Sequence, residues 1–343
     1  MKALKKLSIV ALLTSLAVTG CGGPAHKTPA QLSQASTKNL LTNLPGGNGP
    51  VLAVKIDDTA QAHPQIGLEK ADVIYIEQVE GGLSRIAAIY SNPTSLPDRI
   101  GPVRSARISD LDILAQYGHV GFAFSGAQKL FYPKIDAANL ENISADHEPP
   151  SIYSRDLTRQ APTNLILHPS LLLTKSVEVE KRNIDLPKDP GWVFGSAPAG
   201  GVSIESVSFK WPASRYAATW SSSQKRWLIS YNGAPDLDAN GLQLGSPTLI
   251  IQNVKITPSI YHDKVGGVTP FSETVGSGTA FLMREGRAIP IFWNRASAEQ
   301  STTWTLKDGT PATVATGQIW IALTDSPPVF MNQAPAASAS PTK

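Results

Sequence analysis

Three arginines within nine residues form the densest group of chemistry-bearing side chains in this 343-residue chain. Arg99, Arg104 and Arg107 lie in the run RIGPVRSAR, immediately before a helix start that the sequence predicts at Ser109. Guanidinium groups and the free backbone N–H groups of a helix start can together hold a phosphate or a carboxylate. The run therefore predicts an anion site, to which Arg85 and Asp57 would also contribute.

Acidic residues close to the arginines leave a second interpretation open. Each arginine could be paired internally and support an irregular loop, because charges buried in a protein are usually paired. The acids that lie nearby in sequence, or by strand adjacency, are Asp57, Asp58, Glu77, Glu80, Asp110 and Asp112.

Two features could carry catalysis. Asp57 and Asp58 end a predicted strand, where a metal or a general acid–base pair could sit, although adjacent residues of a regular strand point to opposite faces. Ser125 lies in VGFAFSGA, which resembles a nucleophile elbow except that Ala123 and Ala127 replace both flanking glycines. A tight-turn serine is the alternative interpretation of Ser125.

Metal binding has one weak signal. Asp236, Asp238 and Asn240 copy the first half of a calcium loop, but Pro247 stands where the loop needs a bidentate glutamate. A polar turn explains the same residues. The six histidines show no paired spacing typical of zinc. The sequence thus predicts no cofactor.

The elements that must position these residues change in character along the chain. Residues 51–56, 72–76, 84–90 and 120–124 are predicted strands, and 109–117, 127–135 and 170–182 are predicted helices. Beyond residue 200, short alternating segments and the turn signals Glu285-Gly286 and Asp308-Gly309 indicate hairpins. We therefore predict an α+β fold: a mixed α/β N-terminal domain and a mainly antiparallel β C-terminal domain, as a sheet or partly closed barrel. Six tryptophans of the second domain could fill its core or line a glycan-binding face.

The N-terminus predicts export. Lys2, Lys5 and Lys6 precede an apolar stretch, 7–18, and then VTGCG, the order of a secretory signal. Its end resembles a bacterial lipobox, in which the thiolate of Cys21 would accept the lipid. An ordinary signal peptide with an incidental cysteine is the alternative. Cys21 is the only cysteine, so once it is lipidated no thiol remains for a disulfide.

Composition sets the domain limits and excludes one class of partner. The three lysines of residues 1–20 account for the whole formal charge of +3, so the rest of the chain is neutral and bulk attraction to nucleic acid is excluded. The predicted organisation is a signal peptide at 1–20, lipidated Cys21 and a flexible tether through 50, domains at 51–190 and 200–331, and a disordered tail at 332–343.

Several motifs together resemble the YerB-like family of bacterial lipoproteins, whose function is unknown. They are AVKID at 53–57, ADVIY at 71–75, EGGLSR at 80–85, GQIWI at 317–321 and, most specifically, GPVRSAR at 101–107. The resemblance covers about 51–323 and implies a two-domain, surface-anchored protein without an established reaction. The chain departs from the family pattern at Asp58, where Asn is more usual, and at Asp236, where His tends to follow proline.

These observations favour an extracytoplasmic lipoprotein, anchored by lipid to the cell membrane, that serves as a binding or assembly module. Its partner would be an anionic polymer or a protein of the cell envelope, held by Arg104 and Arg107. The alternative is an envelope-polymer hydrolase or transferase that uses Asp57, Asp58 or Ser125. A third interpretation makes all these polar residues internal supports of loops.

Overall fold

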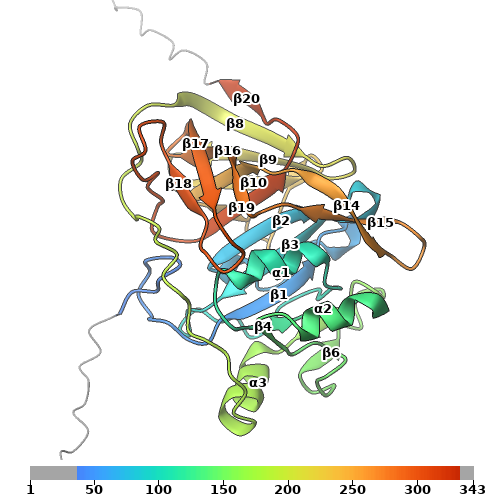
Figure 1. The fold of residues 1–343 in the computed structure, drawn as a ribbon. Coiled ribbons are helices and arrows are strands. Elements are labelled where there is room, and N and C mark those ends of the chain that lie inside the picture. Colours follow the sequence, from blue (N-terminus) through green and yellow to red (C-terminus); the bar gives the residue numbers. More distant parts are fainter. Residues whose placement is uncertain (1–36, 333–343) are drawn as a thin grey trace, which may run out of the picture. The chain divides into compact units, whose positions relative to one another are not determined.

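Strands dominate the part of the chain that the computed structural model describes, residues 37–332 (Figure 1). In the N-terminal region they alternate with short helices. The elements are β1 (Leu52–Asp57), β2 (Val73–Gln78), β3 (Ser84–Tyr90), α1 (Ile108–Ala115), β4 (Val120–Ala123), α2 (Tyr132–Asp136), β5 (Leu140–Asn142), β6 (Tyr153–Arg155), β7 (Leu165–Leu167) and α3 (Pro169–Leu173). Helical turns join them at η1 (Ala60–Ala62), η2 (Leu68–Lys70), η3 (Glu80–Gly82), η4 (Lys129–Phe131) and η5 (Thr174–Val179).

The C-terminal region is built from strands alone. They are β8 (Val202–Lys210), β9 (Arg215–Ser221), β10 (Arg226–Tyr231), β11 (Ala234–Pro235), β12 (Gly245–Ser246), β13 (Thr248–Asn253), β14 (Ile256–His262), β15 (Val268–Ser272), β16 (Gly276–Arg284), β17 (Arg287–Arg295), β18 (Thr303–Thr305), β19 (Ile319–Thr324) and β20 (Val329–Asn332). Most pair antiparallel, and the Glu285-Gly286 turn joins β16 to β17 as predicted.

One large sheet runs through both regions, in the order β11-β10-β9-β8-β17-β16-β13-β19-β2-β3-β1-β4-β5. Strand β19 lies in parallel between β13 and β2 and so joins the two regions. Strands β14 and β15 form a separate hairpin beside α1 (Figure 1). The α+β prediction is confirmed, and of the two C-terminal architectures proposed the chain adopts the sheet rather than a closed barrel.

The sheet separates two hydrophobic cores because side chains alternate along each strand. On β1, Leu52, Val54 and Ile56 enter one core, whereas Ala53 enters the other, which α1 covers through Ile113 and Leu114. Five of the six C-terminal tryptophans are buried, which supports a core role: Trp211, Trp227, Trp293, Trp304 and Trp320.

The tether prediction is wrong for residues 37–50, which are folded. Leu41 is fully buried, and the Asn39 side chain accepts hydrogen bonds from the backbone N–H groups of Leu41 and Thr42. Its amide also donates to Ser91 Oγ at 2.9 Å. The polar residues of this segment, which suggested a flexible tether, instead form a tight turn around Asn39. The predicted signal peptide, Cys21 and the tail beyond Asn332 lie outside the described residues.

The predicted helices are shorter than expected. In place of the predicted helix at 109–117, α1 runs over Ile108–Ala115. Its start is capped by Asp110 rather than by Ser109: the Asp110 carboxylate accepts a hydrogen bond from the Arg107 N–H at 2.6 Å. Segments 127–135 and 170–182 each overlap a helix of only five residues, α2 and α3, which adjoins a 3₁₀ turn (η4) and a π-helical turn (η5) respectively. Within residues 37–332, no helix has the length and apolar character required to cross a bilayer.

Candidate functional site

A pocket of about 490 Å³ lies where the strands β1 and β3 meet the start of α1. We call it the arginine pocket. Its charged wall consists of Arg85, Arg104, Arg107 and Glu80, and its other walls include Phe131, Tyr261 and the tip of the β14–β15 hairpin. Three of the predicted ligand-binding arginines therefore face one cavity, although they come from a strand, a loop and a helix start.

The strand register places the charged groups in one row. Asp57 on β1 lies opposite Arg85 on β3, and Arg85 lies opposite Glu77 on β2. Side chains opposite one another in neighbouring strands share a face of the sheet, so all three project toward α1. Ala53, four residues before Asp57 on β1, projects from this same face into the core that α1 covers.

The loop before α1 adds the other two arginines. Strand β4 pairs with β1 only as far as Val54. Beyond Val54 the loop before α1 pairs with the same edge of β1: Asp57 N donates to Pro102 O and Arg104 N donates to Lys55 O, both at 2.8 Å. Turn η3 needs positive φ at Gly81, which brings Glu80 back toward Arg107.

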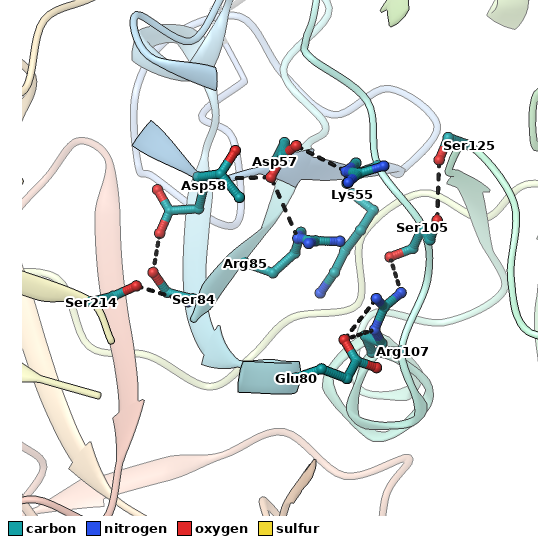
Figure 2. Close-up of polar contacts among 12 residues, drawn as sticks. Lys55, Asp57, Asp58, Glu80, Ser84, Arg85, Ser105, Arg107, Ser125 and Ser214 are labelled. Carbon is teal, nitrogen blue, oxygen red and sulfur yellow. Dashed lines mark hydrogen bonds and ion pairs between the residues drawn. The ribbon is translucent and has the colours of Figure 1, made fainter. Parts of the chain in front are cut away.

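Arg107 is paired within the protein. Its Nε and Nη2 lie 2.9 and 2.7 Å from Glu80 Oε2, and its Nη1 donates to the carbonyls of Ser105 and Ala106 (Figure 2). Glu80 also accepts from Thr269 Oγ1 of β15. Burial would raise the pKa of Glu80, but the hydrogen bond and charge of Arg107 lower it below its usual value. Here the internal-pairing interpretation fits best.

Arg85 is not satisfied in the same way. Its side chain is 5% exposed, and neither Nε nor Nη1 has a hydrogen-bond partner among residues 37–332. The nearest carboxylate oxygen, Asp57 Oδ1, is 3.8 Å from Nε (Figure 2). Burial lowers the pKa of Arg85 to about 10, and the positive charges of Arg107 and Arg104 act in the same direction.

Asp57 is shared between two arginines. Arg104 Nε lies 2.8 Å from Asp57 Oδ2, close enough for an ion pair but poorly aligned for a hydrogen bond. The Arg104 side chain is 26% exposed. Buried donors without acceptors are costly, so the wall formed by Arg85 and Arg104 is electrostatically suited to receive an anion.

A fully buried trio lies next to this wall. Lys55 Nζ contacts Glu77 Oε1 and lies 2.7 Å from Asp110 Oδ1. Burial raises the pKa of Glu77, Lys55 opposes this shift and Asp110 adds to it. Because Lys55 binds a carboxylate on β2 and another on α1, the trio ties β1, β2 and α1 together. All three side chains are fully buried and none lines the arginine pocket.

Comparison with known proteins identifies the architecture around this pocket. Residues 41–184 match the N-terminal domain of the protein family of unknown function DUF3048, and residues 206–321 match its C-terminal domain. The chain belongs to the DUF3048 family. The resemblance inferred from the sequence motifs is thereby confirmed.

YerB of Bacillus subtilis is similar to this DUF3048 chain both in sequence and in structure. "Putative lipoprotein YerB" of Bacillus subtilis (strain 168) is 37% identical over 83 residues, a match that spans 24% of this chain and 23% of that protein. The crystal structure of the YerB protein from Bacillus subtilis superimposes with a TM-score of 0.71 at 19% identity, over 84% of this chain and 97% of that one. The latter shows that the fold is shared.

A second charged group, which we call the histidine cluster, lies on the other side of the β1 end in this DUF3048 protein. It consists of Asp58, His63, Asp236, Tyr216 and Tyr231. His63 Nδ1 lies 2.8 Å from Asp236 Oδ1, its Nε2 lies 3.2 Å from Asp58 Oδ1, and its ring stacks on Tyr231 at 4.2 Å. Asp58 and Asp236, the two positions at which the sequence motifs suggested a departure from the family pattern, thus contact the same histidine.

Hydrogen bonds and ion pairs satisfy Asp58 and His63, whereas Asp236 Oδ2 is buried without a hydrogen-bond partner among residues 37–332. Asp58 accepts from Tyr216 OH at 2.7 Å and from Ser84 Oγ, and its backbone carbonyl accepts from Tyr231 OH at 2.6 Å (Figure 2 shows the Ser84 contact). Burial would lower the pKa of His63, but the hydrogen bonds and charges of Asp236 and Asp58 raise it to about 9. His63 is therefore a cation at neutral pH.

The remaining predicted site residues lie elsewhere. Arg99 is half exposed and contacts Asp156 at 3.4 Å, outside the arginine pocket. Ser125 Oγ lies 3.4 Å from Ser105 Oγ, behind the pocket, and among residues 37–332 it has no hydrogen bond to a histidine or a carboxylate. The structure thus separates Ser125 from both Asp57 and Asp58.

The segment with the weak calcium signal forms a turn. Asp238 Oδ1 accepts from the backbone N–H groups of Asn240 and Leu242 at 2.8 and 2.9 Å, while Asp236 points to His63. The carboxylates of Asp236 and Asp238 therefore bind different partners and do not converge on one site. No convergent group of three or more metal-ligating side chains is present in the described ranges.

Sequence reasoning missed the residues contributed across long sequence distances. Phe131 and Tyr261 line the arginine pocket with ring centroids 5.1 Å apart, and His63 meets Asp236 across 173 residues. No local pattern links either pair.

Proposed function

We propose that this protein is an extracytoplasmic lipoprotein whose folded part binds an anionic group in the arginine pocket. The observation that carries the proposal is Arg85, which lines the cavity and whose buried Nε and Nη1 have no hydrogen-bond partner among residues 37–332. A protein gains nothing in stability from such a group, whereas a bound carboxylate or phosphate would satisfy it. Anchoring is supported by the lipobox-like Cys21 and by the name of the YerB relative.

The anion proposal is tested by titrating the full chain, purified in an uncharged detergent, with sodium acetate and with inorganic phosphate at constant ionic strength. We expect saturable heat by isothermal titration calorimetry. Arg104→Gln and Arg85→Gln should weaken binding at least about tenfold, because each removes a charge-assisted contact. Arg99→Gln is the matched control, since Arg99 lies outside the pocket. Unchanged affinity in both pocket variants with the fold preserved would overturn the proposal.

Anchoring is tested separately. In cells supplied with labelled palmitate, the wild-type chain should incorporate label and Cys21→Ser should not, because serine lacks the thiolate that accepts the lipid. Thr19→Ser, a change at a neighbouring position that keeps the cysteine, should remain labelled. Equal labelling of wild type and Cys21→Ser would contradict lipidation at this residue.

A further inference from the structure

The arginine pocket has much more room than a small anion needs. Its volume of about 490 Å³ falls within the range typical of sites for organic ligands. Near the arginines its walls are apolar, with contributions from Val79, Leu83, Ile108, Phe131 and Tyr261. Phe131 and Tyr261 meet at an interplanar angle of 58° and bring an aromatic surface to the cavity from two distant segments. A ligand that fills the pocket must therefore also bury apolar surface.

The charges at the pocket favour a single negative charge on the ligand. Arg85, Arg104 and Arg107 contact only two carboxylates, Asp57 and Glu80. The neighbouring trio of Lys55, Glu77 and Asp110 adds up to one negative charge, so the excess at the pocket is at most one positive charge. At the rim, Lys264 and Asp263 offset each other. A second negative charge would have no partner in a largely buried site and would be costly to desolvate.

The hairpin that carries Tyr261 is fixed to the charged wall. Thr269 of β15 donates to Glu80, and Ser272 N donates to Ser109 Oγ of α1 at 2.9 Å. Its exposed tip, including Val265 and Lys264, still lines the cavity. The aromatic wall is thus held at a defined place relative to the arginines, which is what recognition of a ligand with two chemically different ends requires.

We infer that the ligand is an amphipathic monoanion, with one singly charged acidic group on Arg85 and Arg104 and an apolar or aromatic body against Phe131 and Tyr261. This inference rests on the proposed function, because it specifies the ligand of the same pocket. The ligand is thereby narrowed from any anion to one chemical class, a carboxylate or a phosphodiester joined to an apolar body.

Four small, water-soluble probes separate charge from body: acetate, phenylacetate, benzyl alcohol and phenyl phosphate, each titrated into the full chain in dodecyl maltoside. We expect phenylacetate to bind at least about tenfold tighter than acetate, since burial of the ring adds to the charge contact. Benzyl alcohol should not bind measurably. Phenyl phosphate at pH 8, a dianion, should bind more weakly than phenylacetate.

Variants then locate the body. Phe131→Ala should reduce phenylacetate affinity to the level of acetate and leave acetate unchanged, whereas Leu130→Ala, at an exposed neighbour, should change neither. Tyr261→Leu, which keeps most of the volume, replaces Phe131→Ala if that variant does not fold.

The outcomes separate this inference from the proposal beneath it. Equal binding of acetate and phenylacetate, both lost in Arg104→Gln, would overturn the amphipathic ligand and keep the anion site. Tighter binding of phenyl phosphate than of phenylacetate would overturn the single charge. If no anion binds, the proposed function fails as well.

Discussion

The arginine pocket and the histidine cluster begin at adjacent residues, Asp57 and Asp58, yet they differ in how completely their charges are satisfied. Asp58 meets a histidine, two hydroxyls and an amide, and His63 has a carboxylate on each ring nitrogen. Asp57 must serve two arginines, and Arg85 keeps unpaired donors. The histidine cluster leaves only Asp236 Oδ2 unpartnered among residues 37–332 and does not line the arginine pocket, so we expect it to hold the fold together. The unpartnered donors of Arg85 lie beside a cavity, which is what the proposed anion site requires.

The largest difference should appear when the histidine cluster is broken. His63→Ala leaves Asp58 and Asp236 buried without their shared cation, so we expect the free energy of unfolding to fall by about 3–5 kcal/mol. Denaturant unfolding at pH 7 measures it. His119→Ala is the matched control: His119 is partly exposed, with Glu141 at 3.7 Å, and its loss should cost under about 1 kcal/mol. Equal effects of both substitutions would contradict a stabilising role for the histidine cluster.

The same cluster predicts that stability falls as pH rises, whereas Arg85 of the arginine pocket, with its pKa lowered to about 10, predicts a rise in stability that begins only near pH 10. The pKa of His63 is raised from 6.5 to about 9 in the folded chain, by the two carboxylates despite burial. The resulting stability is fully present below pH 6.5 and is lost as pH rises through about 9, a decrease of about 3 kcal/mol by linkage. Unfolding free energies between pH 7 and 10 should show this decrease.

A single substitution assigns the pH dependence. In His63→Gln the side chain cannot titrate, so the unfolding free energy should stay nearly constant between pH 7 and 10. Burial raises the pKa of Asp72 to about 6 and that of Glu77 to about 7, so these carboxyls titrate mostly below this window and should add only a small decrease near pH 7. A decrease of the same size in wild type and His63→Gln would assign the effect to another group.

Within the arginine pocket, loss of the paired Arg107 should cost more stability than loss of Arg85. This difference should be smaller than that between His63→Ala and His119→Ala. Arg107→Gln leaves Glu80 buried without its partner and should cost roughly 2 kcal/mol, whereas Arg85→Gln removes a guanidinium with unpaired donors and should cost less than about 1 kcal/mol. Denaturant unfolding without added anions measures both. A greater loss of stability in Arg85→Gln than in Arg107→Gln would mean that Arg85 has a structural role.

The charged wall of the arginine pocket depends on local spacing along the chain, and the sequence predicted it. Alternation along β1 separates Asp57 from Asp58, and the run RIGPVRSAR brings Arg104 and Arg107 to the start of α1, so the charged wall was within reach of sequence reasoning. Arg99 was wrongly grouped with them because nearness in sequence does not fix the direction of a loop residue.

The histidine cluster and the aromatic wall depend on contacts that close over long sequence distances. His63 with Asp236, and Phe131 with Tyr261, join segments that a continuous sheet and a separate hairpin bring together. No propensity or spacing encodes such pairs. The same limitation explains the tether error, since Leu41 becomes buried only because the rest of the fold supplies a core for it.

The smallest effect should come from Ser125, and its size separates the binding proposal from the hydrolase or transferase alternative. Ser125 is half buried, and its hydroxyl has one long contact with Ser105 Oγ, so Ser125→Ala should change the free energy of unfolding by under about 0.5 kcal/mol. It should leave acetate and phenylacetate affinities unchanged, because Ser125 does not line the arginine pocket. The decisive measurement is release of fragments from cell-wall material by the full chain. A catalytic serine without its hydroxyl loses nearly all turnover, so any release that Ser125→Ala abolishes while stability and affinity stay the same would replace the binding proposal with the catalytic one.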